Sequence, residues 1–144
     1  MIIVLQRVDS AHVSVDETII SEIRKGVVLL VCVEESDTKD EILYWAQKIP
    51  ELRIFPDEND KMNISIKEAG AEILVVSQFT LISDLRKGRR PGFQGSAQPD
   101  LAKYRLKEFV DDLKRSGLTV KTGEFAANMK VHLVNDGPVT FILR

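Results

Sequence analysis

Residues 26–49, GVVLLVCVEESDTKDEILYWAQKI, change from one periodicity to another within a single stretch. The run GVVLLVCV is apolar throughout, which is typical of a strand that is covered on both faces. The segment TKDEILYWAQKI has helical spacing, and three apolar residues share one stripe: Ile42, Ala46 and Ile49. Thr38 and Glu41 match the S/T-x-x-E capping box at its start. We therefore predict a buried strand followed by a capped helix, which Pro50 ends.

The segments on both sides of this stretch add strands and one more helix. MIIVLQRV (1–8), AHVSV (11–15) and AEILVVSQFTL (71–81) are strand-like, and LRIFPDENDKMNISI (52–66) holds a short strand and a polar turn. From Pro99 to Gly117, apolar residues repeat at helical spacing. MKVHLV (129–134) and VTFILR (139–144) predict two final strands. The order predicts a single α+β domain over residues 1–144, with a mainly antiparallel sheet and two main helices.

Composition excludes several classes of protein. The 144 residues are 44% hydrophobic and 29% charged, which is ordinary for a soluble globular protein. No apolar run approaches the roughly 18 residues that a membrane helix needs, and the start lacks the features of a signal peptide. We expect a cytoplasmic protein with no membrane partner. The single cysteine, Cys32, allows no disulfide framework within the chain and is interpreted as a small buried hydrophobe.

The histidines and possible metal ligands of the sequence do not match the common kinds of catalytic site. The chain has two histidines, His12 and His132, and each lies on the polar side of a strand pattern, where an exposed histidine is expected. Neither the spacing of a zinc site nor a phosphate-binding P-loop is present. We expect neither a metal nor a cofactor. Net charge is −2, but RKGRRP gathers four basic side chains that could contact nucleic acid: Arg86, Lys87, Arg89 and Arg90.

Two local patterns remain, and each has two interpretations. SQFT (77–80) brings polar groups to the end of an apolar strand, where they line a pocket mouth or simply enter a loop. NDGPVT (135–140) contains Gly137, which permits close backbone approach, and Pro138, which fixes φ and removes a donor. It is either a plain hairpin turn or part of a functional site.

Together these motifs give the chain a family resemblance. IVLQRV, GVVLLV, LRIFPDENDKMNISI, VVSQFTL, RKGRRPGF and VNDGPVT follow one another along essentially the whole chain, and the sequence resembles the D-aminoacyl-tRNA deacylases. It departs from their pattern at Asp60, where glycine is frequent, and at Gly92, where serine often precedes the phenylalanine. The resemblance implies their barrel-like fold and a homodimer with active sites at the subunit interface. It also implies hydrolysis of the ester that joins D-amino acids, or glycine mischarged on tRNA(Ala), to the 3′-terminal adenosine of tRNA.

The resemblance also implies roles for particular residues. Gly137 and Pro138 resemble the family's Gly-cisPro motif, a rim that enters the partner's pocket and excludes L side chains in translational proofreading. Gln78 and the N–H of Phe79 resemble the donors on the carbonyl side, Ser77 shapes that wall, and Thr80 has a supporting role rather than a covalent one.

Three further assignments have plainer alternatives. Arg7 buttresses the rim by resemblance, and otherwise is a surface strand arginine. Met129 packs on the terminal adenine or is an ordinary core methionine. The cluster Arg86, Lys87, Arg89 and Arg90 contacts the phosphates of the acceptor stem, or is a solvated loop.

The sequence is also compatible with two functions other than D-specific deacylation. In one, the chain is a noncatalytic nucleic-acid-binding protein and 135–140 is only a turn. In the other, the chain is a relative with relaxed chiral specificity, in which the Gly137–Pro138 bond is trans. The isomer at this bond cannot be deduced from the sequence.

Overall fold

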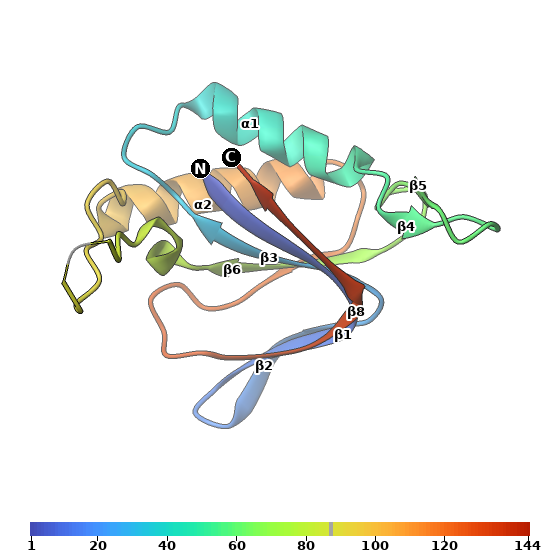
Figure 1. Cartoon of the computed structure of the whole chain (residues 1–144), viewed down its shortest axis with the longest axis horizontal. Coiled ribbons are helices and arrows are strands. Elements are labelled where there is room, and N and C mark those ends of the chain that lie inside the picture. The colour runs from blue at the N-terminus through green and yellow to red at the C-terminus, as the bar shows by residue number, and fades with distance from the viewer. Residues whose placement is uncertain (87) are drawn as a thin grey trace.

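The computed structural model describes residues 1–86 and 88–144. A curved sheet carries both long helices on one of its faces (Figure 1). The elements in chain order are β1 (Ile2–Val15), β2 (Thr18–Ile23), β3 (Gly26–Cys32), α1 (Lys39–Lys48), η1 (Ile49–Glu51), β4 (Phe55–Pro56), β5 (Met62–Ile64), β6 (Glu72–Ser77), η2 (Phe79–Ile82), α2 (Pro99–Lys114), β7 (Val120–Thr122) and β8 (Lys130–Leu143). No helix in the described ranges is long and apolar enough to cross a membrane.

The main sheet has the strand order β2-β1-β3-β6-β7, and β8 pairs with β1 as well. β1 is antiparallel to β2, β3 and β8, whereas β3, β6 and β7 run parallel. The predicted α+β class with a mainly antiparallel sheet is confirmed. Gly26 is required where β3 meets β6, because a Cβ there would lie 2.0 Å from the carbonyl oxygen of Glu72.

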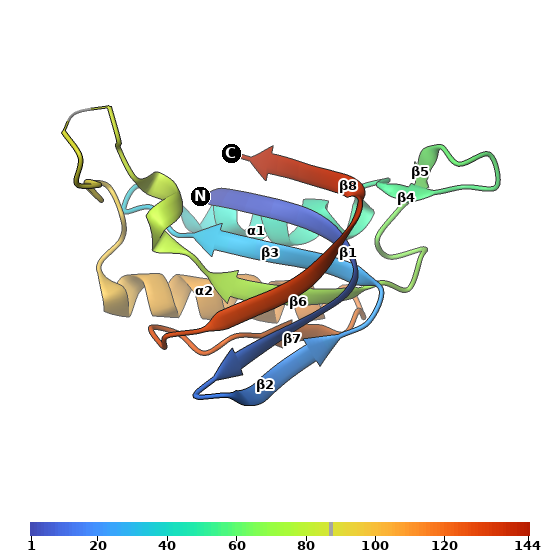
Figure 2. The same cartoon turned by 60° about the horizontal axis from the view of Figure 1, so that its bottom comes forward.

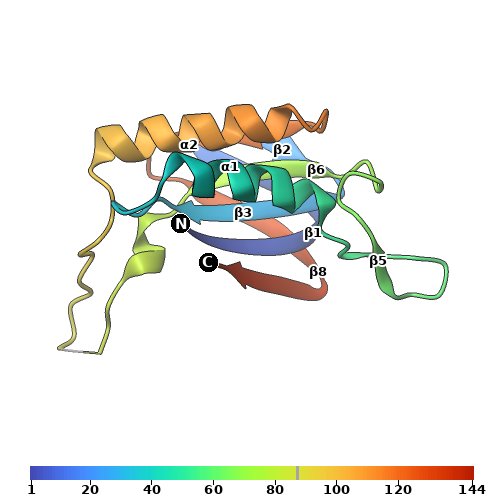
Figure 3. The ribbon, with the colours of Figure 1, turned by 90° about the horizontal axis from the view of Figure 1, so that it is seen from above.

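The core has one part on each face of the sheet. The larger part lies under the helices and includes Leu5, Leu29, Phe55 and Phe109 (Figure 3). The smaller part includes Val13, Val28 and Leu74. It lies on the opposite face, because Val28 alternates along β3 with Val27 and Leu29 of the larger part. A sheet with apolar side chains on both faces matches the uninterrupted apolar run predicted for β3.

Helix α1 forms as predicted, because its start signal is local. The Thr38 hydroxyl accepts from the N–H of Glu41, and the Glu41 carboxylate accepts from the N–H of Thr38. The N–H of Thr38, and its hydroxyl at 2.9 Å, donate to the Glu41 carboxylate and hold the pKa of Glu41 below its usual value. Ile42 and Ala46 are buried, and the chain turns at Pro50 within η1.

The C-terminal region corrects one expectation. Residues 130–143 form a single strand, β8, and not two strands joined by a hairpin turn. Both halves of β8 pair with the same partner: Lys130 opposite Ser14 at one end and Leu143 opposite Ile3 at the other. The strand crosses the sheet with a bend in its middle (Figure 2). The hairpin interpretation of 135–140 is therefore wrong, since a hairpin would pair the two halves with each other.

Candidate active site

A cavity of about 640 Å³ opens beside the end of β6. Its walls come from η2, the start of α2 and the loop that precedes β8. The lining residues are Val33, Val76, Ser77, Gln78, Phe79, Phe93, Ser96, Ala97, Gln98, Pro99, Ala102, Phe125, Ala126, Ala127, Asn128, Met129 and Val131. Four of the predicted site residues thus share one cavity: Ser77, Gln78, Phe79 and Met129. The other predicted site residues that the structure describes are not in this lining: Thr80, Arg7, Gly137, Pro138, Arg86, Arg89 and Arg90.

The SQFT segment forms a polar wall of the cavity. β6 ends at Ser77, and the N–H of Gln78 donates to the carbonyl of Val31 at 2.8 Å. Phe79 is the first residue of η2, so its N–H has no acceptor within that helix. The side-chain amide of Gln78 donates to the hydroxyl oxygen of Thr80. Thr80 therefore contacts the side chain of Gln78 rather than the cavity.

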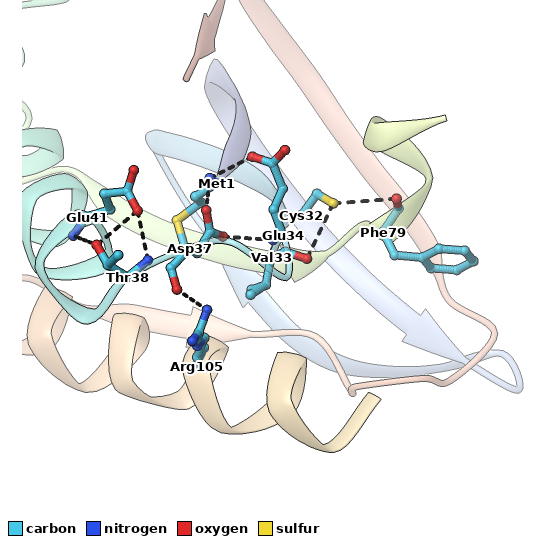
Figure 4. Close-up of polar contacts among 9 residues, drawn as sticks. All are labelled: Met1, Cys32, Val33, Glu34, Asp37, Thr38, Glu41, Phe79 and Arg105. Carbon is cyan, nitrogen blue, oxygen red and sulfur yellow. Dashed lines mark hydrogen bonds and ion pairs between the residues drawn. The ribbon is translucent and has the colours of Figure 1, made fainter. Parts of the chain in front are cut away.

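The wall is supported from behind by the end of β3 (Figure 4). The thiol of Cys32 is buried and donates to the carbonyl of Phe79 at 3.5 Å. Burial raises the pKa of Cys32, and the nearby charge of Glu34 raises it further, so the thiol keeps the proton that it donates. The prediction that Cys32 is buried is confirmed.

A buried carboxylate fixes the segment after β3. Asp37, which is 3% exposed, accepts from the α-ammonium of Met1, and its other oxygen accepts from the N–H of Glu34 at 2.7 Å. Arg105 of α2 donates to the carbonyl of Asp37 (Figure 4). Ala97, in the cavity wall, donates to the carbonyl of Val33 at 3.1 Å. The end of β3, α2 and the cavity wall are thereby linked.

Sequence patterns did not reveal the aromatic part of the cavity. Phe93 meets Phe79 edge to face, with ring centroids 5.1 Å apart, and Phe125 comes from the loop before β8. Met129 packs against Gly123, where a Cβ would lie 2.6 Å from the methionine sulfur. Isolated apolar residues in loops have no periodicity, so nothing in the sequence marked Phe93 or Phe125 as lining residues.

The NDGPVT segment forms a bulge in β8. Asn135 pairs with Val8 and Thr140 pairs with Gln6, so one residue of β1, Arg7, faces four residues of β8, 136–139. The side-chain amide of Asn135 closes the bulge by donating to the carbonyls of Arg7 at 2.9 Å and Val139 at 3.2 Å. The Gly137–Pro138 bond is cis, and both residues are exposed.

Arg7 lies beneath this bulge. It is 8% exposed, and its Nε is 2.8 Å from Oδ2 of Asp136, a contact of opposite charges without the alignment of a hydrogen bond. Nη1 donates to the carbonyl of Ile54 at 2.6 Å, and the guanidinium lies 5.9 Å from the ring centre of Phe55. The alternative of a surface strand arginine is therefore wrong.

Glycine is required at position 137. Its φ is +116°, and a Cβ there would lie 2.8 Å from Cγ2 of Val139 and 3.2 Å from Nη2 of Arg7. The bulge and the cavity are separate features of the chain, because the bend of β8 and the η2 segment lie at opposite ends of the molecule (Figures 1 and 2).

The basic loop follows η2. Arg86, Arg89 and Arg90 are exposed, and Lys87 is outside the described residues. Arg86 forms a double contact with Asp84, with Nε–Oδ1 and Nη2–Oδ2 both at 3.0 Å. This hydrogen-bonded guanidinium lowers the pKa of Asp84. Within the described ranges, neither Arg89 nor Arg90 forms an ion pair.

The two histidines are opposite each other on β1 and β8. Their rings stack with centroids 4.3 Å apart, and His132 is exposed as predicted while His12 is half-buried. Across residues 1–86 and 88–144, no three His, Cys, Asp or Glu side chains are grouped as metal ligands would be.

Comparison with known proteins places these features in a family. Residues 4–144 match the family model described as D-Tyr-tRNA(Tyr) deacylase. A D-aminoacyl-tRNA deacylase of Clostridioides difficile is 54% identical over 140 residues, covering 97% of this chain and 94% of the relative. One of Shewanella pealeana is 49% identical over 144 residues, covering 100% of this chain and 99% of the relative.

Two solved structures share the fold of this chain. A protein described as c-Myc DNA Unwinding Element Binding Protein superimposes with a TM-score of 0.92 at 38% identity, over 100% of this chain and 98% of the other. A probable eukaryotic D-amino acid tRNA deacylase, only 16% identical, shares the fold with a TM-score of 0.88, over 99% of this chain and 97% of the other. The chain therefore belongs to the D-Tyr-tRNA(Tyr) deacylase family.

Proposed function

We propose that this protein hydrolyses the ester of D-aminoacyl-tRNA and of glycyl-tRNA mischarged on tRNA(Ala), releasing free tRNA and the amino acid. It acts as a chiral proofreading enzyme in the cytoplasm, as a homodimer of one deacylase domain, residues 1–144. The observation that carries the proposal is the pairing of a donor-lined cavity at SQFT with an exposed, firmly held bulge at Gly137 and Pro138. Family membership and the names of the relatives support it.

The two parts meet across a dimer interface in this proposal. Gly137 and Pro138 are exposed and outside the cavity of their own chain, so their surface is free to enter the cavity of a second copy. β8 pairs only with β1 among the described strands, and it exposes Val134 at 55% and Ile142 at 66%. An edge strand with exposed apolar side chains is a surface that another chain can cover.

The chemistry assigned to the cavity is orientation and electrostatic stabilisation. Gln78 and the N–H of Phe79 donate toward the oxygen that becomes negative as water attacks the ester carbonyl, and Thr80 positions Gln78. Ser77 shapes the wall, and Met129 packs on the terminal adenine. An aminoacyl ester is already activated, and the 2′-hydroxyl of the tRNA assists the water. The cavity orients and desolvates the ester.

Selectivity follows from exclusion in this proposal. The rim of Gly137 and Pro138 faces the α-carbon and the ammonium group of the aminoacyl moiety, where an L side chain would collide with it. A D side chain points away toward solvent, so its identity matters little. Glycine has no side chain to reject and is accepted. Arg7 keeps the rim in place through its contact with Asp136.

The basic loop supplies affinity for the rest of the substrate. Arg86, Lys87, Arg89 and Arg90 contact phosphates of the acceptor stem, which gives binding without sequence recognition. The double contact of Arg86 with Asp84 leaves Arg89 and Arg90 as the stronger candidates among the described residues.

The test is deacylation of matched D-tyrosyl-tRNA, L-tyrosyl-tRNA and glycyl-tRNA at low enzyme concentration, with a chelator present. We expect rapid loss of the D-tyrosyl and glycyl esters while the L-tyrosyl ester is spared. Equal rates for the D and L esters would keep the enzyme but overturn the exclusion rim, and would favour a relative with relaxed chiral specificity. No hydrolysis of any ester would overturn the proposed function.

A second candidate is a noncatalytic nucleic-acid-binding protein. The observation that favours it is the name of the relative with the 0.92 TM-score, a DNA unwinding element binding protein. This candidate requires strongly salt-dependent binding to nucleic acid and no ester hydrolysis in the same assay. In this candidate 135–140 is only a hairpin turn, which the pairing of both halves of β8 with β1 contradicts.

A further inference from the structure

A second cavity adjoins the first. Its volume is about 480 Å³, and it lies between α2 and the ends of β6 and β7. The lining residues are Val75, Ser77, Asp100, Lys103, Tyr104, Leu106, Lys107, Val110, Asp111, Lys114, Thr122, Gly123 and Phe125. We call it the α2 groove. Ser77 and Phe125 line both cavities, so the groove adjoins the candidate active site.

The α2 groove has an apolar floor and a lysine rim. Leu106 and Val110 are among its apolar residues, and three lysines face it from α2. Lys107 is paired with Asp111 at 2.5 Å, so that charge is offset. Lys103 and Lys114 are exposed and form no ion pair with the described residues. The charges that remain are these two lysines against one carboxylate, Asp100, which leaves an excess of one positive charge.

An aromatic ring lies on the rim of the same groove. Tyr104 is 60% exposed, and its hydroxyl donates to Oε1 of Glu108 at 3.0 Å. This bond holds the ring along the helix surface. Aromatic rings beside positive charges are the usual elements of sites for single-stranded nucleic acid, because bases stack on the ring and the cations contact phosphates.

We propose that the α2 groove binds the single-stranded nucleotides that precede the terminal adenosine of the tRNA. Lys103 and Lys114 contact their phosphates, and Tyr104 stacks on a base. This inference rests on the proposed function, which puts the aminoacylated adenosine in the first cavity. The next nucleotides are covalently joined to that adenosine, so they must leave by an adjoining path, and the groove shares two lining residues with the cavity.

Position along α2 ranks the two lysines. Pro99 and Ala102 line the first cavity, so Lys103 is next to the adenosine site, whereas Lys114 ends the helix. At about 1.5 Å per helical residue, Lys103 and Lys114 are separated by roughly 16 Å along α2. Lys103 therefore contacts the phosphate nearest the terminal adenosine, and its replacement has the larger effect.

The test compares two substrates, D-tyrosyl-tRNA and D-tyrosyl-adenosine, of which the second has no preceding nucleotides. For Lys103→Ala we expect KM to rise roughly tenfold with D-tyrosyl-tRNA and the plot of log KM against log salt to flatten by about 0.7, the value for one phosphate of a single strand. The rise with D-tyrosyl-adenosine is at least fivefold smaller. Lys114→Ala should also raise KM more with D-tyrosyl-tRNA than with D-tyrosyl-adenosine, but by a smaller factor than Lys103→Ala.

The matched control is Lys48→Ala, which removes an exposed, unpaired lysine from the end of α1, outside both cavities. It leaves both KM values within twofold. Tyr104→Ala weakens only the tRNA substrate, and Tyr104→Phe restores it because the ring still stacks. Equal effects of Lys103→Ala on both substrates, or no effect on either, would overturn the inference.

Binding provides a measurement that does not depend on turnover. Uncharged tRNA should bind more tightly than the same tRNA without its last three nucleotides, and Lys103→Ala should reduce that difference roughly tenfold. If the two tRNAs bind the wild-type protein equally, the groove does not hold the 3′ end. A protein that hydrolyses D-tyrosyl-adenosine but shows no such difference retains the proposed function and loses only this inference.

Discussion

The cavity wall and the bulge of β8 differ in shape and in what holds them. The SQFT wall is concave, and backbone and neutral hydrogen bonds fix it, such as those from Gln78 to Val31 and from Cys32 to Phe79. The bulge is convex and exposed, and one buried cation lies beneath it, Arg7. One region is built to receive a ligand and the other to project. Each is half of the proposed site, and the two halves lie on opposite sides of the same folded subunit (Figure 1).

The largest expected effect tests whether the two halves meet between subunits. Gln78→Ala removes a donor from the wall, and we expect kcat to fall by roughly 10² to 10³ with the fold intact. Arg7→Ala leaves Asp136 without its cation and loosens the bulge. The rim then no longer positions the α-carbon and ammonium group of the D ester, and we expect a comparable fall. Each variant alone is then nearly inactive, as measured by deacylation of D-tyrosyl-tRNA.

Mixing the two variants tests the geometry directly. A mixed dimer has one site with an intact wall from one chain and an intact bulge from the other, so co-refolded subunits should regain about a quarter of wild-type activity if half of the dimers are mixed. If wall and bulge served the same chain, no mixture would recover. Gln78→Ala mixed with the double variant Arg7→Ala/Gln78→Ala, in which neither chain has an intact wall, is the control that should stay inactive.

The next effect concerns stability. Asp37 is buried behind the wall with the Met1 ammonium and the N–H of Glu34 as partners, so Asp37→Ala leaves a buried cation without its main counter-charge. We expect a loss of about 3 kcal/mol in the free energy of unfolding, measured by urea denaturation. Glu35→Ala, at an exposed neighbour, should change it by less than about 0.5 kcal/mol.

The wall and the bulge have separate supports, so Asp37→Ala should leave the function of the bulge intact. Below the unfolding transition, the Asp37→Ala protein should keep its preference for D over L esters, because the bulge is supported by Arg7 and not by Asp37. A lost preference in a folded protein would show that support behind the wall also sets the bulge.

The sequence predicted local features well. Both helices form where the sequence predicted them, from the capping box at Thr38 and Glu41 and from the apolar stripe of α2. These signals are local, because the residues that make up each one lie within a few positions of one another along the chain. The sequence also indicated SQFT and NDGPVT as candidate site segments. Of the residues predicted for the site, Gln78, Phe79 and Met129 share a cavity.

The features that were missed depend on pairing between distant strands. Residues 130–143 were divided into two strands because Gly137 and Pro138 are turn residues, yet the pairing of β8 with β1 on both sides of them makes a bulge. The burial of Arg7 follows from the same pairing together with Ile54 and Phe55, far along the chain. The short strand β7 and the edge strand β2 lack a distinct apolar pattern.

The smallest effect separates the wall's chemistry from its shape. Thr80→Val keeps the volume of Thr80 but removes the oxygen that accepts from the Gln78 amide. A lost hydrogen bond of this kind is worth about 1 kcal/mol, so we expect a roughly fivefold fall in kcat for D-tyrosyl-tRNA, with KM within twofold. Thr80→Ser retains the hydroxyl and should restore kcat.

The ratio of D to L deacylation rates in the Thr80 variants tests whether the wall contributes to chiral selection. Thr80 contacts Gln78 of the wall, whereas Arg7 and Asn135 hold the bulge, so the ratio of D to L rates should be unchanged in both Thr80 variants. If Thr80→Val admits the L ester, then the position of Gln78 contributes to exclusion and the division between a catalytic wall and a selective bulge fails. If Thr80→Ser is as slow as Thr80→Val, the methyl packing of Thr80 and not its oxygen positions Gln78.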